Sequence, residues 1–587
     1  DFAIVNTEKL ISIDEISPQE KELSNKILFE TSDETISNFV NLYREKKGIE
    51  KKIDTINITT EEQISNLVVE GSKKDLYKLI DILLEKYKPL DIINGPLMSG
   101  MDEVGKLFNK NDLIVAEVLQ SAEVMKASVS HLEKFMEKSE VSTKGTVIMA
   151  TVKGDVHDIG KNLVSIIIGN NGYNVIDLGI NTPAEKIKEA IIKYKADFLG
   201  LSGLLVKSAT EMVNTVSVLR DSGISIPIFV GGAALTEKFT INKIEPSYKN
   251  NIVIYSNDAM TALSDLNKMI DPEKFKEFKN YLQTRRDFHT ITNENSLKKI
   301  EVRETINFNK NDDTFFDFSK VELPKYNFDK IYEPSNLNKN IITNINSKEV
   351  FKYINLQMLM GKHLGMKWVI NNLLENKDPK AIKIYNEIMS IINQGDEYFD
   401  IKAIYKYFPA KRNGESIEIL SDDLTSVIEK FSFPRQKWGK YLSLNDYVSS
   451  DKIDYIGMFV VSAGEKSRLV SNELISKGEF YLGHLVNSLG LELAEATAEY
   501  IHKIMREDVG ITDNSISQED ILKAKYQGKR YSFGYSACPD LSDQKKLFNL
   551  LKPEKYGIKL TEGYMMYPEA SVSAIVFSHP FTKYFNL

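Results

Sequence analysis

The residue with the clearest chemical potential in this chain is a histidine between two aspartates. His157 lies in the stretch Asp155-Val156-His157-Asp158-Ile159-Gly160-Lys161-Asn162. A neighbouring carboxylate can fix the tautomer of an imidazole and raise its basicity, as a metal-ligating histidine requires. Glycines at 154 and 160 would let a bulky group approach the backbone. The alternative is that His157 only caps a helix, and the residues themselves leave both interpretations open.

The elements around His157 indicate where it lies. The apolar run 146–152 predicts a buried strand, and 163–168 predicts the start of a helix. Further strands, alternating with helices, are expected at Asn174–Leu178, Phe198–Leu201, Ile226–Val230 and Ile252–Tyr255. A repeat of about 25 residues indicates right-handed βαβ units and a Rossmann-like, doubly wound parallel sheet. His157 would then lie at the carboxyl edge of the sheet, where such sheets bind ligands.

The motif Asp155-x-His157-x-x-Gly160 resembles the cobalamin-binding signature of methionine synthases, corrinoid methyltransferase proteins and some mutases. In that family the histidine displaces the base of the cofactor's nucleotide tail and ligates cobalt from below. The resemblance implies that His157 is the metal ligand of cobalamin, which carries the methyl group as methylcobalamin. The longer stretch from Gly154 to Asn162 is similar to the methyltransferase branch. The same match implies cofactor contacts from the loop residues Gly154, Val156, Asp158 and Gly160.

The family match also implies a slot for the nucleotide tail and a relay behind His157. Ser208 is expected to hydrogen-bond Asp155, forming a Ser208–Asp155–His157 chain that tunes the cobalt ligand. Ser208 can equally be an ordinary helix N-cap. Val206-Lys207 replaces the usual Thr-Pro, so a side-chain contact with the corrin is expected to be lost at Val206. The remaining slot residues implied by the match are Ser202, Gly231, Gly232, Ala233 and Asp258.

Residues about 56 to 140 predict a four-helix bundle. Apolar residues recur there at helical spacing, and short polar breaks separate the segments. Thr60-Glu61-Glu62 resembles an N-cap and first turn. The bundle is similar to the cap over the upper face of cobalamin, which implies that Phe108 and Val115 shield the methyl group. Asn94 falls at a cofactor position where the family usually has an acid.

Residues about 346 to 587 resemble the reactivation domain of methionine synthases, a mixed α+β domain that binds S-adenosylmethionine. Two motifs carry the match, namely the segments 530–540 (RYSFGYSACPD) and 560–580, which begins LTEGYMMYP. Arg530 is a plausible bidentate partner for the ligand's carboxylate. Asn355 stands where the family commonly has Asp, Phe533 replaces Pro, and Glu569 replaces Gly. The full set of implied ligand contacts is Asn355, Glu495, Arg530, Ser532, Gly534, Tyr535, Tyr584 and Phe585.

Composition bounds the class of protein. The chain has 587 residues, of which 42% are hydrophobic and 27% charged, with a net charge of −8. These values are typical of a globular protein of several domains, and they give no basic region for nucleic acid. The single cysteine, Cys538, excludes internal disulfides and a multi-thiolate metal site within this sequence. No apolar run reaches membrane length. We expect a cytoplasmic protein without a membrane span.

The motifs together predict a multidomain α/β chain with five segments. Residues 1–52 are expected to be the tail of a pterin-binding barrel and a linker helix, and the chain, which starts at Asp1, a fragment or a processed product. The expected units then follow as 53–142 (helical cap), 143–278 (cobalamin domain), 279–345 (linker) and 346–587 (S-adenosylmethionine-binding reactivation domain).

The resemblance implies the C-terminal part of a cobalamin-dependent methionine synthase, a methyltransferase. The family moves a methyl group from methyltetrahydrofolate to cobalamin and then to homocysteine, and reactivates Co(II) cobalamin with S-adenosylmethionine and one electron. Folate and homocysteine modules, the latter with zinc, are expected upstream or on another chain, and the electron from a flavodoxin-type donor. The alternatives are a non-catalytic corrinoid carrier or cobalamin sensor, and an adenosylcobalamin mutase. Neither alternative needs a reactivation domain.

Overall fold

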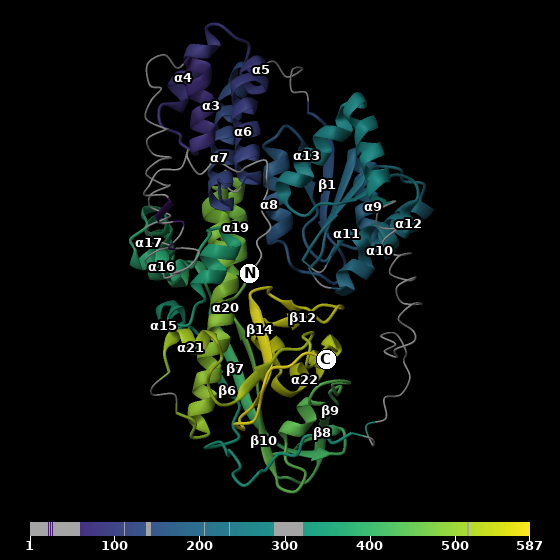
Figure 1. Ribbon diagram of the computed structural model, residues 1–587, viewed down its shortest axis with the longest axis vertical. Coiled ribbons are helices and arrows are strands. Elements are labelled where there is room, and N and C mark those ends of the chain that lie inside the picture. The colour runs from purple at the N-terminus through teal and green to yellow at the C-terminus, as the bar shows by residue number, and fades with distance from the viewer. Residues whose placement is uncertain are drawn as a thin grey trace.

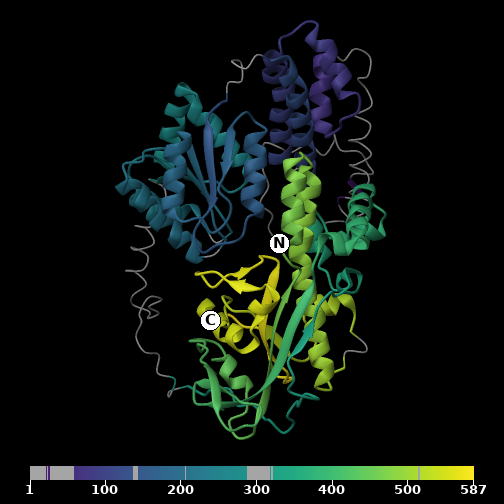
Figure 2. The same ribbon diagram turned by 180° about the vertical axis from the view of Figure 1, so that it is seen from behind.

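The computed structural model describes three folded units. The described residues are 59–110, 112–136, 143–204, 206–233, 235–286, 318, 321–512 and 516–587, with 21, 22, 24 and 26. The expected barrel tail, the polar run 307–313 and the side chain of Val206 lie outside this description. Figures 1 and 2 show the helical unit and the parallel-sheet unit side by side at one end, with the C-terminal unit below them. One long C-terminal helix, α20 (Phe480–Asp508), rises from the C-terminal unit toward the helical unit.

Residues 59–136 form the predicted bundle of helices. Thr59, one residue earlier than expected, caps the first helix and makes a reciprocal capping box with Glu62. Among the apolar residues that recur at helical spacing, Ile64, Val68 and Ile80 are fully buried, and Leu67 and Leu79 are partly buried. The longer helices are α3 (Thr60–Glu70), α4 (Leu76–Leu84), α6 (Met98–Asn109) and α7 (Val115–Leu132), with short α5 (Pro89–Ile92) and η3 (Ile93–Leu97) between them.

Residues 143–286 form the predicted doubly wound parallel sheet. Its strand order is β2-β1-β3-β4-β5, so the order reverses beside β1, and His157 follows that strand. This reversal creates the crevice where such sheets bind ligands. The strands are β1 (Thr146–Thr151), β2 (Asn174–Asp177), β3 (Phe198–Ser202), β4 (Ile228–Gly231) and β5 (Val253–Tyr255). The helices are α8 (Ile159–Gly169), α9 (Ala184–Tyr194), α10 (Val206–Asp221), α11 (Glu237–Phe239), η5 (Thr240–Ile244), α12 (Glu245–Tyr248) and α13 (Ala259–Ile270).

The loops after β3 and β4 touch at a glycine, which gives a stability prediction. Gly232 has a φ of +153°, and a Cβ added there would lie 1.7 Å from the Gly203 carbonyl oxygen. We expect Gly232→Ala to destabilise the sheet unit by about 3 kcal/mol or more, because strain and overpacking combine. Gly223→Ala is the matched control, since Gly223 also has a positive φ but an added Cβ meets nothing within 4 Å. It should cost about 1–2 kcal/mol. Urea unfolding followed by circular dichroism measures both, and equal costs would contradict the predicted loop contact.

The C-terminal unit contains an antiparallel sheet beside α20. Its seven strands run in the order β11-β14-β10-β7-β8-β9, with β6 also paired to β7. The strands are β6 (Asn340–Ile342), β7 (Lys402–Asn413), β8 (Ser416–Leu420), β9 (Val427–Phe431), β10 (Asp454–Ser462), β11 (Lys529–Tyr531) and β14 (Ser571–Phe577). A separate two-stranded hairpin joins β12 (Lys559–Leu560) to β13 (Met566–Tyr567). Besides α20, the helices include α15 (Ser347–Phe351), α16 (Ile370–Glu375), α17 (Pro379–Asn393), α19 (Lys466–Ser476), α21 (Gln518–Leu522) and α22 (Gln544–Leu551), with the π-helical segment η7 (Gln357–His363).

Part of the expected linker belongs to this unit. The sequence predicts a linker over 279–345, and the structure describes 321–345 of it. In the structure β6 pairs with β7, and the Tyr326 ring stacks on Phe581 with centroids 4.3 Å apart. Phe328 packs edge-on against His579. Buried aromatic contacts thus attach this segment despite its polar neighbours.

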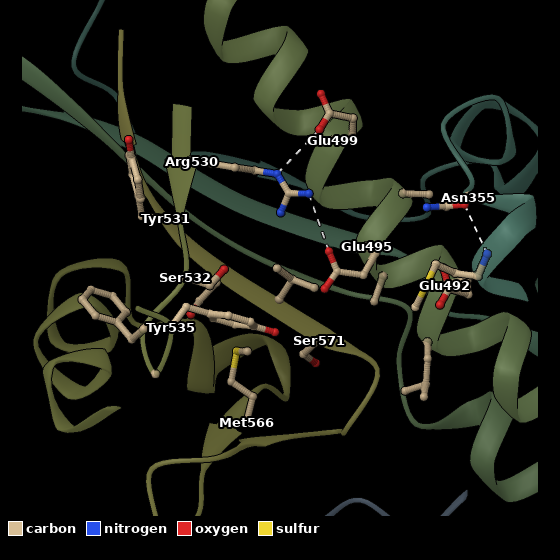
Figure 3. Close-up of a pocket in the computed structure, with 18 of the residues that line it drawn as sticks. Asn355, Glu492, Glu495, Glu499, Arg530, Tyr531, Ser532, Tyr535, Met566 and Ser571 are labelled. Carbon is tan, nitrogen blue, oxygen red and sulfur yellow. Dashed lines mark hydrogen bonds and ion pairs between the residues drawn. The ribbon is translucent and has the colours of Figure 1, made fainter. Parts of the chain in front are cut away.

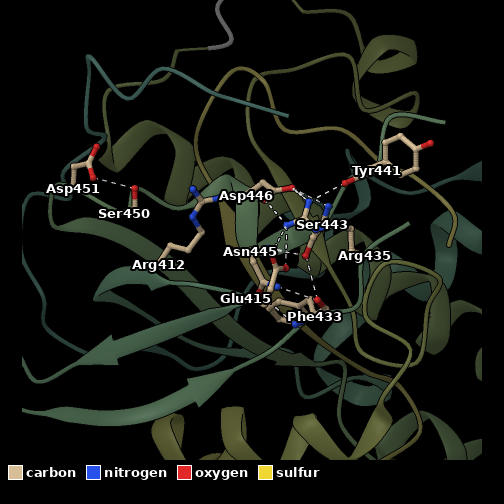
Figure 4. Close-up of polar contacts among 10 residues, drawn as sticks. All are labelled: Arg412, Glu415, Phe433, Arg435, Tyr441, Ser443, Asn445, Asp446, Ser450 and Asp451. Carbon is tan, nitrogen blue, oxygen red and sulfur yellow. Dashed lines mark hydrogen bonds and ion pairs between the residues drawn. The ribbon is translucent and has the colours of Figure 1, made fainter. Parts of the chain in front are cut away.

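A buried ion-pair network holds the loop before β10 against β7 (Figure 4). The Asp446 carboxylate is 2% exposed and accepts from the guanidinium of Arg435 at 2.6 and 2.7 Å and from Arg412 at 3.1 Å. Arg435 also pairs with Glu415. Asp446 is therefore a buried carboxylate between two arginines.

The described helices give no candidate membrane span. α20 has 29 residues, but charged and polar side chains interrupt it, and none of the other described helices is long and apolar enough to cross a bilayer. Many of the buried residues of α20 contribute instead to an apolar core shared with α7 and α8.

Candidate functional site

His157 is the first member of a hydrogen-bonded chain at the carboxyl edge of the parallel sheet. Its Nδ1 lies 2.6 Å from Asp155 Oδ1, and its backbone N–H donates to the same oxygen at 3.0 Å. The other oxygen, Oδ2, accepts from Ser208 Oγ at 2.5 Å and from the Leu204 N–H at 2.7 Å. The structure therefore contains the expected Ser208–Asp155–His157 chain. Because Asp155 occupies Nδ1, Nε2 is the nitrogen left for a ligand.

The Asp155 carboxylate is fully buried and stays ionised. Burial is the largest influence and acts to raise its pKa, but the hydrogen bonds from His157 and Ser208 outweigh burial and lower the pKa to about 2. An ionised Asp155 at neutral pH keeps a proton on Nδ1 of His157. The chain is thus arranged to present the lone pair of Nε2.

His157 faces a cavity of about 1010 Å³ that it shares with the C-terminal unit. Of the described residues of the parallel-sheet unit, His157 and Leu204 line this cavity. The other lining residues come from η7, α20, β11 and the segments 532–541 and 565–573, among others (Figure 3). We call this space cavity 1. It joins the two sites that the sequence predicts separately.

Arg530 lies in cavity 1 between two carboxylates of α20 (Figure 3). Its Nη2 is 3.6 Å from Glu495 Oε2, and its Nε is 3.6 Å from Glu499 Oε2. The Glu495 side chain is 55% exposed and that of Glu499 only 10%. Burial would lower the pKa of Arg530, but the two carboxylates raise it, so the guanidinium stays charged. A third anion, such as a ligand carboxylate, can therefore approach Arg530 from the exposed Glu495 side.

The remaining predicted contacts of the C-terminal unit also line cavity 1. They are Asn355, Ser532, Gly534, Tyr535, Tyr584 and Phe585. Gly534 has a φ of +90° and its N–H donates to the Cys538 carbonyl, which makes a tight turn. Burial raises the pKa of the Cys538 thiol to about 12, and Sγ donates to the Ser532 carbonyl. Cys538 thus remains a protonated thiol that supports the turn.

A second cavity, of about 450 Å³, opens beside the sheet and is called cavity 2. Predicted slot residues lie together on its wall, namely Gly160, Ser202, Gly231, Gly232, Ala233 and Asp258. Asp258 also caps α13, where its carboxylate accepts from the Thr261 N–H at 2.8 Å. Most of the other lining side chains are apolar. The cavity is suited to a flat, partly apolar group.

Some predicted contacts lie elsewhere. Phe108 and Val115 line cavity 2, not cavity 1, so they do not stand opposite His157. The C-terminal unit occupies that side, and the cap helices lie beside the sheet. Asn94 is exposed in η3 and lines neither cavity. Val156 is 2% exposed and packs inside the loop.

The two units meet along a seam next to His157. Lys153 Nζ lies 2.8 Å from Glu562 Oε2, and Lys207 Nζ is 3.5 Å from the Gly563 carbonyl. Gly154 and Gly563 are in backbone contact, because a Cβ on Gly563 would lie 2.7 Å from the Gly154 oxygen. These contacts join the His157 loop to the β12–β13 turn.

Glu569, one of the departures noted in the sequence, lies at this seam in cavity 1. Burial, followed by the nearby charges of Asp158 and Asp155, raises its pKa well above the ordinary value. Its Oε2 and the Asp158 Oδ1 are buried without a hydrogen-bond partner in the described chain. This environment therefore favours the protonated form of Glu569, and both groups have unused hydrogen-bonding capacity.

Comparison with known proteins relates these units to known domain families. Residues 339–587 match the sequence model of the activation domain of vitamin B12 dependent methionine synthase. Residues 60–133 and 145–264 match two models that are each described as a B12 binding domain. The C-terminal unit is thus similar to the activation domain of vitamin B12 dependent methionine synthase, and the helical and parallel-sheet units to B12 binding domains. The predicted resemblance is thereby confirmed for the helical, parallel-sheet and C-terminal units.

Full-length relatives agree with this similarity. The chain is 30% identical to the methionine synthase of Mycobacterium tuberculosis and 29% identical to that of Mycobacterium leprae. Both alignments cover 100% of this chain and 52% of the relative, so the chain spans about half the length of these synthases. Among solved structures, the MetH reactivation domain bound to AdoHcy is 26% identical, with a TM-score of 0.40. The match covers 46% of this chain and 85% of the solved reactivation domain.

The residues of the B12 binding domains fit cobalamin. Cavity 2 holds one buried polar atom without a partner in the described chain, Ser256 Oγ, among mostly apolar neighbours. A flat base with a polar sugar would complement that lining. Ser256 was not predicted, although it directly follows β5, just as Gly232 follows β4. The rule that loops at the carboxyl edge bind ligands would have found it.

A polar stripe runs along α20, and only one of its members, Glu495, was predicted from the sequence. Glu492, Glu495, Glu499, His502 and Arg506 recur at intervals of three and four residues and share one face. Glu492 pairs with His363 Nε2 at 3.0 Å, and Tyr526 OH donates to Glu499 Oε2 at 2.9 Å. The Arg506 guanidinium lies 3.9 Å from the Tyr526 ring centroid. The spacing of these residues at three and four positions, in a mostly apolar helix, was the feature of the sequence that could have revealed the stripe.

His502 on this stripe predicts a pH dependence of stability. It is fully buried, neither ring nitrogen has a hydrogen-bond partner in the described chain, and it packs edge-on against Tyr526. Burial, then the charges of Arg506, Arg530 and Lys529, lower its pKa well below 6.5. Below about pH 6.5, His502 takes up a proton when the protein unfolds. The stability that comes from the neutral, buried ring is therefore complete above about pH 6.5. As the pH falls below this value, the free energy of unfolding decreases by up to about 1.4 kcal/mol per pH unit.

We expect His502→Phe to flatten the dependence of unfolding free energy on pH between 5 and 7, measured in urea by circular dichroism. The phenyl ring keeps the packing and has no proton to gain. His131→Gln, which removes a surface histidine in contact with Asp81, is the control and should leave this component in place. An unchanged slope in His502→Phe would show that His502 does not cause it.

Proposed function

We propose that this chain is the cobalamin-handling and reactivation part of a methionine synthase, a cobalamin-dependent methyltransferase. It binds cobalamin through His157 and S-adenosylmethionine beside Arg530, and it restores inactive Co(II) cobalamin by reductive methylation. The observation that carries this proposal is cavity 1, which has His157 on one wall and Arg530 on another. A methyl donor and a metal centre would face each other in it.

The His157 loop supplies the lower side of the cobalamin site. When bound, cobalamin provides a cobalt centre that can accept a methyl group and pass it on. His157 Nε2 is the cobalt ligand in this proposal, and Asp155 fixes the ring through Nδ1. Ser208 donates to Asp155, so the three residues together fix the orientation of the imidazole. The nucleotide tail occupies cavity 2.

The C-terminal unit supplies the methyl donor. Arg530 binds the carboxylate of S-adenosylmethionine, because a guanidinium can hold a carboxylate through two N–H groups. Glu495 takes the ligand's ammonium group, since it is exposed and lies in the same cavity. The aromatic rings of Tyr535 and Tyr584 are available to pack against the ligand. These residues line the same cavity as His157, which brings the donor site and the cobalt ligand together.

We assign the other parts of the methionine synthase reaction to regions outside this sequence. Its length, about half that of the relatives, supports folate and homocysteine modules in the remainder or on another chain. One cysteine cannot build the zinc–thiolate site expected for homocysteine. The single electron for reactivation comes from an external, flavodoxin-type donor.

A labelling experiment tests the proposal. The chain, loaded with Co(II) cobalamin, is given a one-electron reductant and S-adenosylmethionine with a radioactive methyl group. We expect the label to become protein-bound and to be released by light, because methyl–cobalt bonds are photolabile. Omission of the reductant is the control and should abolish labelling. Tight cobalamin binding without any photolabile label would contradict reductive methylation by this chain.

A further inference from the structure

The two ion pairs of Arg530 differ in burial although their lengths are the same. Both nitrogen–oxygen distances are 3.6 Å, but the Glu495 side chain is 55% exposed and the Glu499 side chain 10%. Exposed pairs are screened and contribute little, whereas a buried charge that loses its partner carries a large penalty. An incoming anion will therefore replace Glu495 at Arg530 and leave Glu499 in place.

Glu499 is itself held from behind by buried groups. Tyr526, which is 6% exposed, donates its hydroxyl to Glu499 Oε2 at 2.9 Å, the same oxygen that faces Arg530 Nε. Burial and then the Glu499 charge raise the pKa of Tyr526, so the hydroxyl keeps its proton and remains a donor. Arg506 Nη1 lies 3.7 Å from the other oxygen, Oε1. Glu499 is thus a buried carboxylate between two arginines, fixed by a tyrosine.

The two carboxylates then determine which edge of the Arg530 guanidinium a ligand carboxylate can bind. Glu499 occupies the Nε side, and Glu495 faces Nη2. Once Glu495 has moved, the end formed by Nη1 and Nη2 is free for two parallel bonds to a carboxylate. A guanidinium that could rotate would lose this pre-organised edge and part of the binding free energy.

We propose that Glu499, fixed by Tyr526, is the positioning residue that aligns Arg530 for the carboxylate of the amino-acid ligand, while Glu495 is the partner that this carboxylate displaces. The inference rests on the proposed binding of S-adenosylmethionine. It assigns specificity for the carboxylate to a residue that does not touch the ligand.

The test compares two ligands that differ only in the carboxylate. Calorimetry measures binding of S-adenosylmethionine and of its decarboxylated analogue to the full chain loaded with cobalamin. We expect Glu499→Gln to weaken S-adenosylmethionine about tenfold or more and the analogue less than about twofold, because the lost interaction involves only the carboxylate. Tyr526→Phe should act in the same selective direction, by about threefold, since it removes one hydrogen bond to Glu499.

Asp446→Asn is the matched control. Asp446 is also a buried carboxylate between two arginines, but it does not line cavity 1 (Figure 4). It should reduce stability and leave both affinities unchanged. If Glu499→Gln does not fold, Tyr526→Phe provides the same comparison.

Each result has one meaning. Selective loss of S-adenosylmethionine affinity in Glu499→Gln or Tyr526→Phe supports the positioning role. Equal losses for both ligands, or no loss, would overturn it, because Glu499 would then only support the cavity or play no part. Failure of the wild-type chain to bind S-adenosylmethionine would refute the proposed function itself, and the positioning role with it.

Discussion

His157→Gly should remove the lower cobalt ligand from the chain loaded with methylcobalamin, with a visible spectrum that differs from that of the wild type. Asp155 occupies Nδ1 of His157 at 2.6 Å, and its pKa of about 2 keeps it ionised at neutral pH. The proton is thereby held on Nδ1 and the Nε2 lone pair is available to metal. Glycine has no donor atom, so we expect a complete change in ligation, not a graded one.

Two further samples separate ligation from folding. Imidazole added to His157→Gly should restore the wild-type spectrum, because a free imidazole can enter the space left by the side chain. Ser208→Ala keeps the ligand and removes only the 2.5 Å bond to Asp155, so it should shift the spectrum much less. Identical spectra for the wild type and His157→Gly would mean that His157 does not ligate cobalt. That result would favour a corrinoid carrier or a cobalamin sensor.

The parallel-sheet unit could be predicted nearly to the residue, for a physical reason. Its strands are continuous apolar runs between turn residues, and short-range sterics determine both. The strand predicted from Thr146 to Val152 is observed as Thr146–Thr151, and that predicted from Ile252 to Tyr255 as Val253–Tyr255. Asp155 and His157 follow β1, and Ser208 lies in the first turn of α10 after β3, so the three residues come together because β1 and β3 are neighbouring strands.

Contacts between units could not be predicted in the same way. Gly154 meets Gly563, and Lys153 meets Glu562, across a large separation in sequence. No periodicity encodes how one folded unit docks on another. The same limit explains Phe108 and Val115, whose expected place above His157 presupposes one arrangement of the cap. In this arrangement the C-terminal unit faces His157 instead, and both residues line cavity 2.

Polar side chains buried in a helix are the other feature that was not predicted from the sequence. Glu499 and His502 lie on an otherwise apolar stretch of α20, and a search for apolar periodicity counts them as interruptions. Buried charges require partners, and those partners, Tyr526, Arg506 and Arg530, become visible only in three dimensions. Helical spacing of charged residues is thus a signal for a site within a core helix.

Arg530→Gln should abolish measurable binding of S-adenosylmethionine, with at least about a hundredfold loss of affinity. The variant removes the bidentate donor for the ligand's carboxylate. It also removes the cation that lies beside Glu495 and Glu499 in cavity 1, so their negative charges would repel that carboxylate. Both effects act in the same direction, which is why the expected loss exceeds that of a single neutral hydrogen bond.

Calorimetry with S-adenosylmethionine measures this loss, and Arg530→Lys shows its cause. Lysine retains the positive charge but provides no planar pair of N–H groups, so we expect an affinity between those of the wild type and Arg530→Gln. Lysine equal to arginine would mean that charge alone attracts the ligand and that the aligned edge is irrelevant. Unaltered binding in Arg530→Gln would place the carboxylate elsewhere. The cobalamin spectrum of each variant should match that of the wild type, because Arg530 does not contact the Asp155–His157 pair, and this shared spectrum confines the effect to the donor side of cavity 1.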